Sequence, residues 1–216
     1  MNQTTFTVQE AIDNLYHTFA IYRLNPHMEA CPCCVYDEDK RHLQSKPLQK
    51  LSTSDLCKYA YKALSTLGNE NDFKHFLPRL FEIITFEAIA LTDPEILFGK
   101  LDYAEWHNWP LHEQKAIELY FSALWEYLLN QTIPEDYTIV GSYLCGIAKA
   151  TQNVEPFLKM WQSNSDQNAR LHLQFFLTQH CEEFLAKEFR SDFWNTCPEQ
   201  AHQVIVWAAE QENGII

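Results

Sequence analysis

The sequence predicts an all-α protein, and three observations support that fold class. Apolar residues recur at the three- and four-residue spacing of a helix along most of the chain. The 216 residues include only five glycines, which is few for a turn-rich β fold. No stretch alternates apolar and polar residues between hairpin turns, so no sheet is expected.

The N-terminal part combines one helix with one long irregular segment. The helix is predicted over residues 7–22 from an apolar stripe made of Ile12, Leu15, Tyr16, Phe19 and Ala20. Residues 24–50 lose this periodicity and contain three prolines beside a cysteine cluster. We therefore expect a loop at 24–50, and long ordered loops often carry a functional site.

Residues 51–130 have the pattern of four successive helices. Capping residues, prolines and apolar spacing place their starts near residues 54, 72, 94 and 111. The first is expected to reach Leu67, where Gly68 ends it, and the second contains Pro78. The strongest signal is the wide apolar stripe of residues 111–130, which predicts a long helix there.

Four more helices are expected in the C-terminal part. Their predicted ranges are 137–150, 154–162, Asp166 to about residue 185, and 198 to about 210. The third of these is expected to turn a set of apolar side chains inward: Leu173, Phe176, Leu177, Cys181, Phe184 and Leu185.

The helices after residue 50 fall into pairs that start near residues 54, 94, 138 and 166. The first two spacings, about 40 and 44 residues, match HEAT and armadillo hairpins, whereas the third, about 28, does not. The predicted architecture is an irregular stack of antiparallel helical hairpins, a HEAT/armadillo-like α-α superhelix. A compact orthogonal helical bundle is the alternative. A single domain is expected over 1–216, comprising an N-terminal helix (1–23), a Cys-rich loop (24–50) and a helical-hairpin body (51–216).

Three sequence segments carry a resemblance. They are Asp72-Phe73-Lys74-His75-Phe76-Leu77-Pro78-Arg79-Leu80, Ile96-Leu97-Phe98-Gly99-Lys100-Leu101 and Trp106-His107-Asn108-Trp109-Pro110. Together with the Cys-rich loop, they resemble a set of all-helical bacterial proteins to which no activity is attached. The resemblance covers roughly residues 30–130. It implies a bacterial origin and brings no catalytic residue with it.

The net charge of −13 bears on the kind of partner. Twelve of the thirteen net negative charges fall in residues 54–216, so the acidity belongs to the helical body. Such a field repels nucleic acid and anionic membranes and attracts a basic protein. Acidity is also a common route to solubility, and that reading stays open. Residues 1–6 lack the pattern of a secretory leader and no apolar run approaches a membrane span, so a cytoplasmic location is expected.

Cys31-Pro32-Cys33-Cys34 is the most specific local motif. Cys31 and Cys34 have the C-x2-C spacing of a zinc knuckle, and His42 and Cys57 are the candidates to complete a tetrahedral zinc site. Plain reduced thiols in a packed loop are the alternative. A redox switch is disfavoured because residues 37–39 are acidic, which is expected to raise the pKa of a nearby thiol.

The known enzyme motifs are absent from this sequence. It contains no H-E-x-x-H, no P-loop, no G-x-G-x-x-G and no G-x-S-x-G. The predicted function is therefore non-enzymatic. An enzyme with an unfamiliar helical site that draws on His75, His107 and His112 is the least favoured alternative.

The preferred function is a protein-binding module, in the sharper form an immunity-type protein that neutralises a basic toxin by covering it. Two indoles, Trp106 and Trp109, flank a tight turn and are candidate partner anchors, together with Glu113, Glu118 and Glu126 on the helix that follows. The competing interpretation folds this turn onto its own helix pair. A zinc-stabilised regulatory or adaptor domain is the alternative function.

Overall fold

The computed structural model describes residues 6–87, 91–132 and 140–215. Every regular element in these ranges is a helix, apart from isolated β-bridges that Leu67 makes with Ala30 and Ala63, so the all-α prediction is confirmed. The chain divides into two compact units, Met1–Ala123 and Leu124–Ile216. The hairpin stack and the single domain over 1–216 stay predictions.

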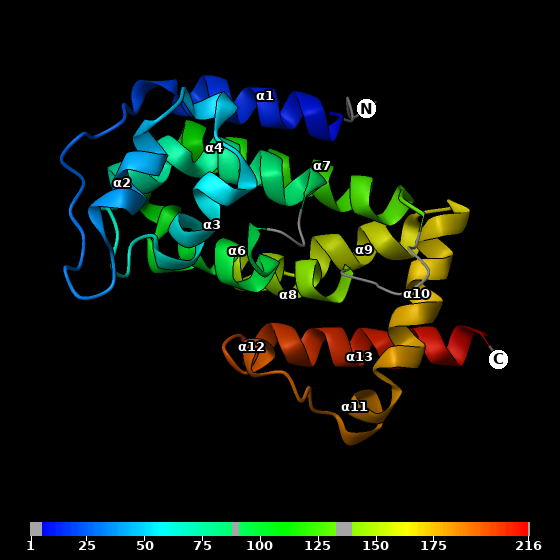
Figure 1. The fold of residues 1–216 in the computed structure, drawn as a ribbon. Helices are drawn as coiled ribbons and strands as arrows, with labels where there is room; N and C mark the ends of the chain where they lie inside the picture. The colour runs from blue at the N-terminus through cyan, green and yellow to red at the C-terminus, as the bar shows by residue number, and fades with distance from the viewer. Residues whose placement is uncertain (1–5, 88–90, 133–139, 216) are drawn as a thin grey trace. The chain divides into compact units, whose positions relative to one another are not determined.

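The first unit holds the helices of the N-terminal half (Figure 1). They are α1 (Val8–Thr18), α2 (Asp37–Gln44), α3 (Thr53–Lys62), α4 (Glu70–Phe86), α6 (Pro94–Tyr103) and the start of α7 (Leu111–Asn130), with short 3-10 turns η1 (Phe19–Ile21), η2 (Leu48–Lys50) and η3 (Trp106–Asn108). The long α4 is the central element of this unit, since α1, α3, η1 and η2 all contact it.

Capping explains where α1 and α4 begin. The Thr7 side chain accepts a hydrogen bond from the backbone N–H of Glu10, and Asn69 does the same for Asp72. Each cap satisfies a backbone donor that the first turn of a helix leaves without a partner. The apolar stripes behind these caps are buried, with Ile12 and Leu15 of α1 fully inaccessible. Residue 78, although proline, lies inside α4 as expected.

Two expectations for the first unit are wrong. The predicted loop at 24–50 contains α2, an eight-residue helix whose acidic first turn and basic last turn suit the helix dipole. The helix expected to reach Leu67 ends at Lys62 instead. Residues 63–67 form a turn in which Leu64 has a φ of 66°, and Leu67 is buried through that turn rather than through a helical stripe.

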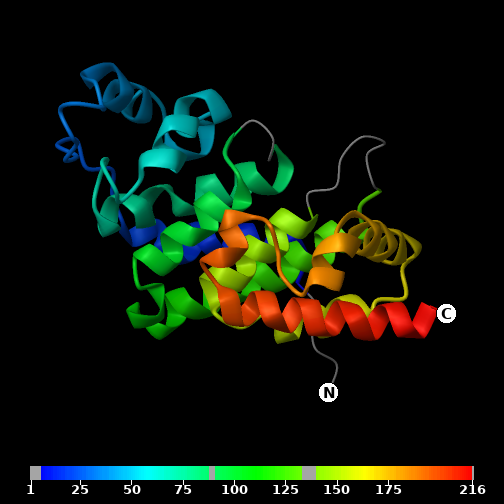
Figure 2. The ribbon, with the colours of Figure 1, turned by 90° about the horizontal axis from the view of Figure 1, so that it is seen from below.

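The second unit contains the end of α7 and the helices α8 (Val140–Thr151), α9 (Glu155–Ser163), α10 (Gln167–Gln179), α11 (Cys181–Ala186), α12 (Asp192–Asn195) and α13 (Pro198–Ile215). The last helix, red in Figures 1 and 2, contacts α8, α9, α11 and α12. Buried indoles lie at the centre of this second unit. The ring centroid of Trp161 is 5.3 Å from that of Trp125 and 5.5 Å from that of Trp207.

A single helix from Asp166 to about residue 185 was expected, and the structure divides it at His180 into α10 and α11. The break rotates the apolar stripe of the second part. Phe176, Leu177 and Phe184 are buried as expected, whereas Cys181 is exposed and Leu185 is 81% exposed. None of the helices described here is both long and apolar enough to cross a bilayer.

Candidate functional site

The most concentrated set of potential metal ligands in the described ranges is a group of three thiols, Cys31, Cys33 and Cys34. Their Sγ atoms all lie within 4.8 Å of one another, and the Sγ atoms of Cys31 and Cys33 are 2.8 Å apart. Cys33 is exposed and the other two are half-buried. A tight turn brings them together, because the Cys31 carbonyl accepts hydrogen bonds from the N–H groups of both Cys34 and Val35.

This cysteine turn (residues 31–34) is fixed to the turn at 63–68. The Cys31 N–H donates to the Thr66 carbonyl at 2.8 Å, and the Gly68 N–H donates to the Glu29 carbonyl at 2.8 Å. Gly68 has a φ of 74°, and a Cβ on it would lie 2.9 Å from the Cβ of Asp72 and 3.2 Å from the Sδ of Met28. Only glycine suits this backbone conformation and this close approach. The thiols are thus positioned by backbone contacts with a segment more than thirty residues later in the sequence.

The thiols influence one another's pKa values. A hydrogen bond from the Cys33 thiol, followed by further contacts with Cys33 and Cys34, lowers the pKa of Cys31. The same hydrogen bond and the negative charges of its neighbours raise the pKa of Cys33 to about 11. The expectation that the acidic stretch 37–39 raises the pKa of these thiols is therefore wrong for Cys31, since its nearest neighbours are S–H donors. The lowered pKa favours the thiolate form of Cys31, which is the form that binds a soft metal ion.

The dimensions of this thiol group suit a zinc-sized ion. Zn–S bonds of about 2.3 Å place the sulfur atoms of a tetrahedral site about 3.8 Å apart. No separation within the group exceeds 4.8 Å, and the Cys31–Cys33 pair, at 2.8 Å, would need to open by about 1 Å. Three thiolates leave one tetrahedral position for a water molecule or another donor.

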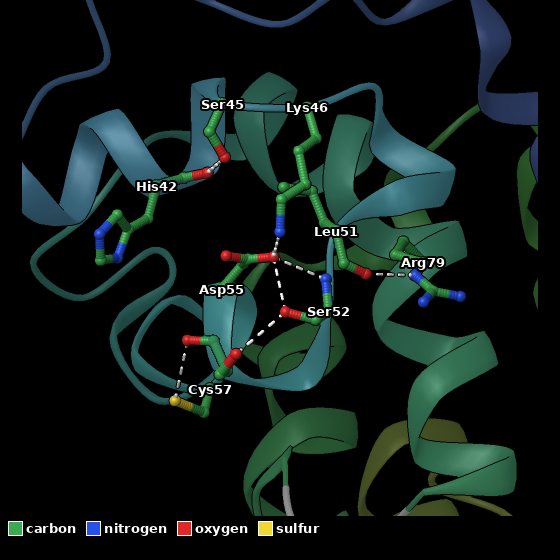
Figure 3. A network of polar contacts seen from close by, with 9 residues as sticks. His42, Ser45, Lys46, Leu51, Ser52, Asp55, Cys57 and Arg79 are labelled. Carbon is green, nitrogen blue, oxygen red and sulfur yellow. Dashed lines mark hydrogen bonds and ion pairs between the residues drawn. The ribbon is translucent and has the colours of Figure 1, made fainter.

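Two predicted metal ligands, His42 and Cys57, do not belong to this thiol group. The Cys57 Sγ lies 3.7 Å from the Ser54 carbonyl oxygen. Figure 3 shows Cys57 with its contact as a dashed line. The His42 Nε2 lies 3.9 Å from a Glu38 carboxylate oxygen. Of the predicted set, the structure therefore unites Cys31 and Cys34 and adds Cys33. The zinc-knuckle pattern uses the first and last cysteines of C-x2-C, which are Cys31 and Cys34 here. It therefore gave no reason to choose Cys33.

A second polar cluster lies in the interior of the first unit. The Lys74 ammonium is 3.0 Å from a Glu113 carboxylate oxygen and 2.9 Å from one of Glu70, and 4.0 Å from the centroid of the Trp109 ring. The Tyr22 hydroxyl donates to Glu113 at 2.5 Å. Burial opposes the charge on Lys74, but its hydrogen bonds to Glu70, Glu113 and Tyr22 raise its pKa above the usual value. Lys74 is therefore a cation held inside the protein.

This cluster changes the interpretation of the predicted partner-binding residues. Trp106, Trp109 and Glu113 are 1%, 5% and 0% exposed, so they are not surface anchors. The two indoles of the turn are buried, as the competing interpretation requires, but the turn does not pack on its own helix pair alone. The Trp109 side chain also contacts Phe73 and Lys74 of α4. Glu118 is exposed and Glu126 half-buried, and these two remain available for a partner.

The three histidines of the enzyme alternative do not share a cavity. His75 lines a cavity of about 280 Å³ in the first unit, whereas His107 and His112 are exposed and are not among its lining residues. Among the described residues that line this cavity, His75 is accompanied by no acidic side chain and by no serine, threonine or cysteine.

Comparison with known proteins adds no assignment. No protein-family model, no curated protein and no solved structure matches this chain. The resemblance to bacterial proteins over residues 30–130 therefore stays a prediction.

Proposed function

We propose that this chain is a zinc-stabilised, non-enzymatic adaptor domain whose metal is held by Cys31, Cys33 and Cys34. One observation carries the proposal: three thiols converge within 4.8 Å on a turn that backbone hydrogen bonds hold in place. Thiolate is a donor that zinc prefers, and a zinc ion would offset two of the three negative charges of adjacent thiolates.

The physical benefit of a metal here is order in a segment with little core of its own. Between residues 24 and 50 the buried apolar side chains are Met28, Val35 and Leu43. A structural metal ion supplies folding free energy to such a segment because its ligands are brought together only in the folded state.

Metal analysis of protein purified without a polyhistidine tag tests this proposal. We expect about one equivalent of zinc per chain, and much less in Cys34→Ser. Cys181→Ser is the matched control, since Cys181 is an exposed cysteine on α11 outside the thiol group. Less than about a tenth of an equivalent in the unaltered protein, after refolding with zinc present, would refute the proposal.

A second candidate function, binding of a basic protein partner in the cytoplasm, is favoured by the net charge. Residues 54–216 carry twelve net negative charges, and complementary charge accelerates the encounter of two proteins and selects against wrong partners. In its sharper form the chain is an immunity-type protein that covers a basic toxin. Adaptor and immunity roles both require a surface for a protein partner and no catalytic site.

A pull-down from the native host at low and then moderate salt tests the second candidate. We expect one basic partner that moderate salt weakens. Reversing the charge of two remaining candidates, Glu118→Lys with Glu126→Lys, should reduce capture more than reversing Glu188 and Asp192, which are exposed acids elsewhere on the chain. Equal capture by both double variants would show that Glu118 and Glu126 of α7 do not contact the partner.

A further inference from the structure

The cavity beside His75 has a lining that is unusual for so acidic a protein. It measures about 280 Å³ and lies between α1, η1, η2 and α4. Its lining residues are Tyr16, Phe19, Ala20, Tyr22, Arg23, Pro47, Leu48, Gln49, His75 and Pro78. None of them is acidic, although the chain carries a net charge of −13.

Two of the polar side chains that line the cavity are already engaged elsewhere. The Tyr16 hydroxyl donates to Glu82 at 2.5 Å, and the Tyr22 hydroxyl donates to Glu113 at 2.5 Å. In the part of the chain that the structure describes, the exposed Arg23 guanidinium has no ion-pair or hydrogen-bond partner. The cavity therefore offers one uncommitted positive charge.

The hydrogen-bonding state of His75 follows from its partner. Its Nδ1 lies 3.1 Å from the Tyr22 carbonyl oxygen, which can only accept, so Nδ1 carries the proton. In the neutral ring Nε2 is then a hydrogen-bond acceptor. The Arg23 charge acts on this imidazole, and so does that of the buried Asp72, whose carboxylate accepts from the Asn69 N–H.

We propose that this cavity binds a small organic anion with a hydroxyl or ammonium group beside its acid group, such as a hydroxy acid. The acid group would pair with Arg23, and the adjacent donor would bind Nε2 of His75. Phe19, Leu48 and Pro78 would contact the apolar body of the ligand. The volume is below that of a drug-sized site, so the ligand is small.

Calorimetric titration with four probes tests the proposal on the whole chain. Mandelate carries both groups, phenylacetate lacks the hydroxyl, mandelamide lacks the charge, and phenyl phosphate replaces the carboxylate. We expect mandelate to bind more tightly than phenylacetate and at least tenfold more tightly than mandelamide, since a hydrogen bond to a charged group is worth about 1.5–3 kcal/mol. Phenyl phosphate binding more tightly than mandelate would overturn the preference for a hydroxy carboxylate.

Two variants separate the two contacts. Arg23→Gln should weaken mandelate at least tenfold, and Arg41→Gln, which changes an exposed arginine on α2, should leave it unchanged. His75→Leu should abolish the preference for mandelate over phenylacetate while Arg23 still holds the acid. Unchanged binding in Arg23→Gln, equal binding of mandelamide, or no binding of any probe up to about 10 mM would each overturn the proposal.

Discussion

Lys74 and Glu113 form an ion pair of 3.0 Å inside the first unit, and their side chains are 4% and 0% exposed. The two residues lie on α4 and α7, and the Trp109 ring covers the ammonium at 4.0 Å from its centroid. Removing charges from water is costly, so such a pair is tolerated only when each partner compensates the other.

The first prediction concerns the removal of one partner. Lys74→Met leaves the Glu113 carboxylate buried without its cation and should lower the free energy of unfolding by about 3–5 kcal/mol. The double variant Lys74→Met/Glu113→Leu removes both charges and should recover most of that loss. Urea denaturation followed by circular dichroism measures the differences.

The exposed pair of Lys159 and Glu155, 2.5 Å apart on α9, supplies the control. Lys159→Met should change stability far less than Lys74→Met, because both partners stay hydrated. Equal losses in the two single variants would show that burial does not determine the strength of the Lys74 pair.

The second prediction is a pH dependence that originates at His172. Its Nε2 donates to the Gln131 carbonyl at 2.9 Å, while its Nδ1 is buried with no hydrogen-bond partner in the described ranges. Burial lowers the pKa of His172 below the usual 6.5, against the smaller opposing effect of that hydrogen bond. The unfolded chain therefore takes up the proton first as the pH falls. Stability that is present above pH 6.5 is lost as the pH falls from there toward the lower pKa of the folded state.

Thermal unfolding at pH 7.5 and about pH 5 measures this effect. His172→Gln keeps an N–H donor for the Gln131 carbonyl but does not titrate, so the loss on acidification should be smaller than in the unaltered protein. His27→Gln changes an exposed histidine and should leave the acid sensitivity as it was. An equal loss in His172→Gln would assign the effect to other groups, among them His75, whose pKa burial also lowers.

The helices of this protein could be predicted from its sequence where the apolar pattern is long and its ends are marked. The range expected for α7, 111–130, is that of the structure, because its stripe is wide and Pro110 precedes it. In contrast, α2 buries only Leu43, and its capping box and charge order leave no periodic apolar signal. The division at His180 has no marker in the form of proline or glycine.

The candidate site could be predicted in part. The cysteine motif identified the segment that holds the thiol group. Which of its cysteines belong to the group depends on which side chains the turn brings together. Cys33 joins the group because the turn brings it to Cys31, whereas Cys57 lies on α3 and contacts the Ser54 carbonyl. Trp109 is buried against Phe73 and Lys74 of α4, and no spacing in the sequence relates these residues to the turn.

The third prediction concerns Gly68, which joins the two turns. Gly68→Ala places a side chain at a φ of 74° and 2.9 Å from the Asp72 Cβ, so the backbone must shift. We expect a loss of about 1–3 kcal/mol in the free energy of unfolding, measured by urea denaturation. Asn69→Ala, which removes the cap of α4 but not the turn, should cost about 1 kcal/mol. A neutral Gly68→Ala would show that this turn relaxes without cost.

The fourth prediction links the metal to stability. Zinc that binds only the folded chain adds about 2.7 kcal/mol when its free concentration is one hundred times the dissociation constant. The unaltered protein should therefore melt at a higher temperature with zinc than with a chelator. The melting temperature of Cys31→Ser should be the same with zinc as with the chelator. Gly68→Ala should show a smaller zinc effect than Asn69→Ala, because Gly68 donates its N–H to Glu29 beside the cysteine turn. Magnesium is the control ion, since it prefers oxygen ligands and should leave the melting temperature unchanged. A zinc effect of the same size in Cys31→Ser would place the ion elsewhere on the chain.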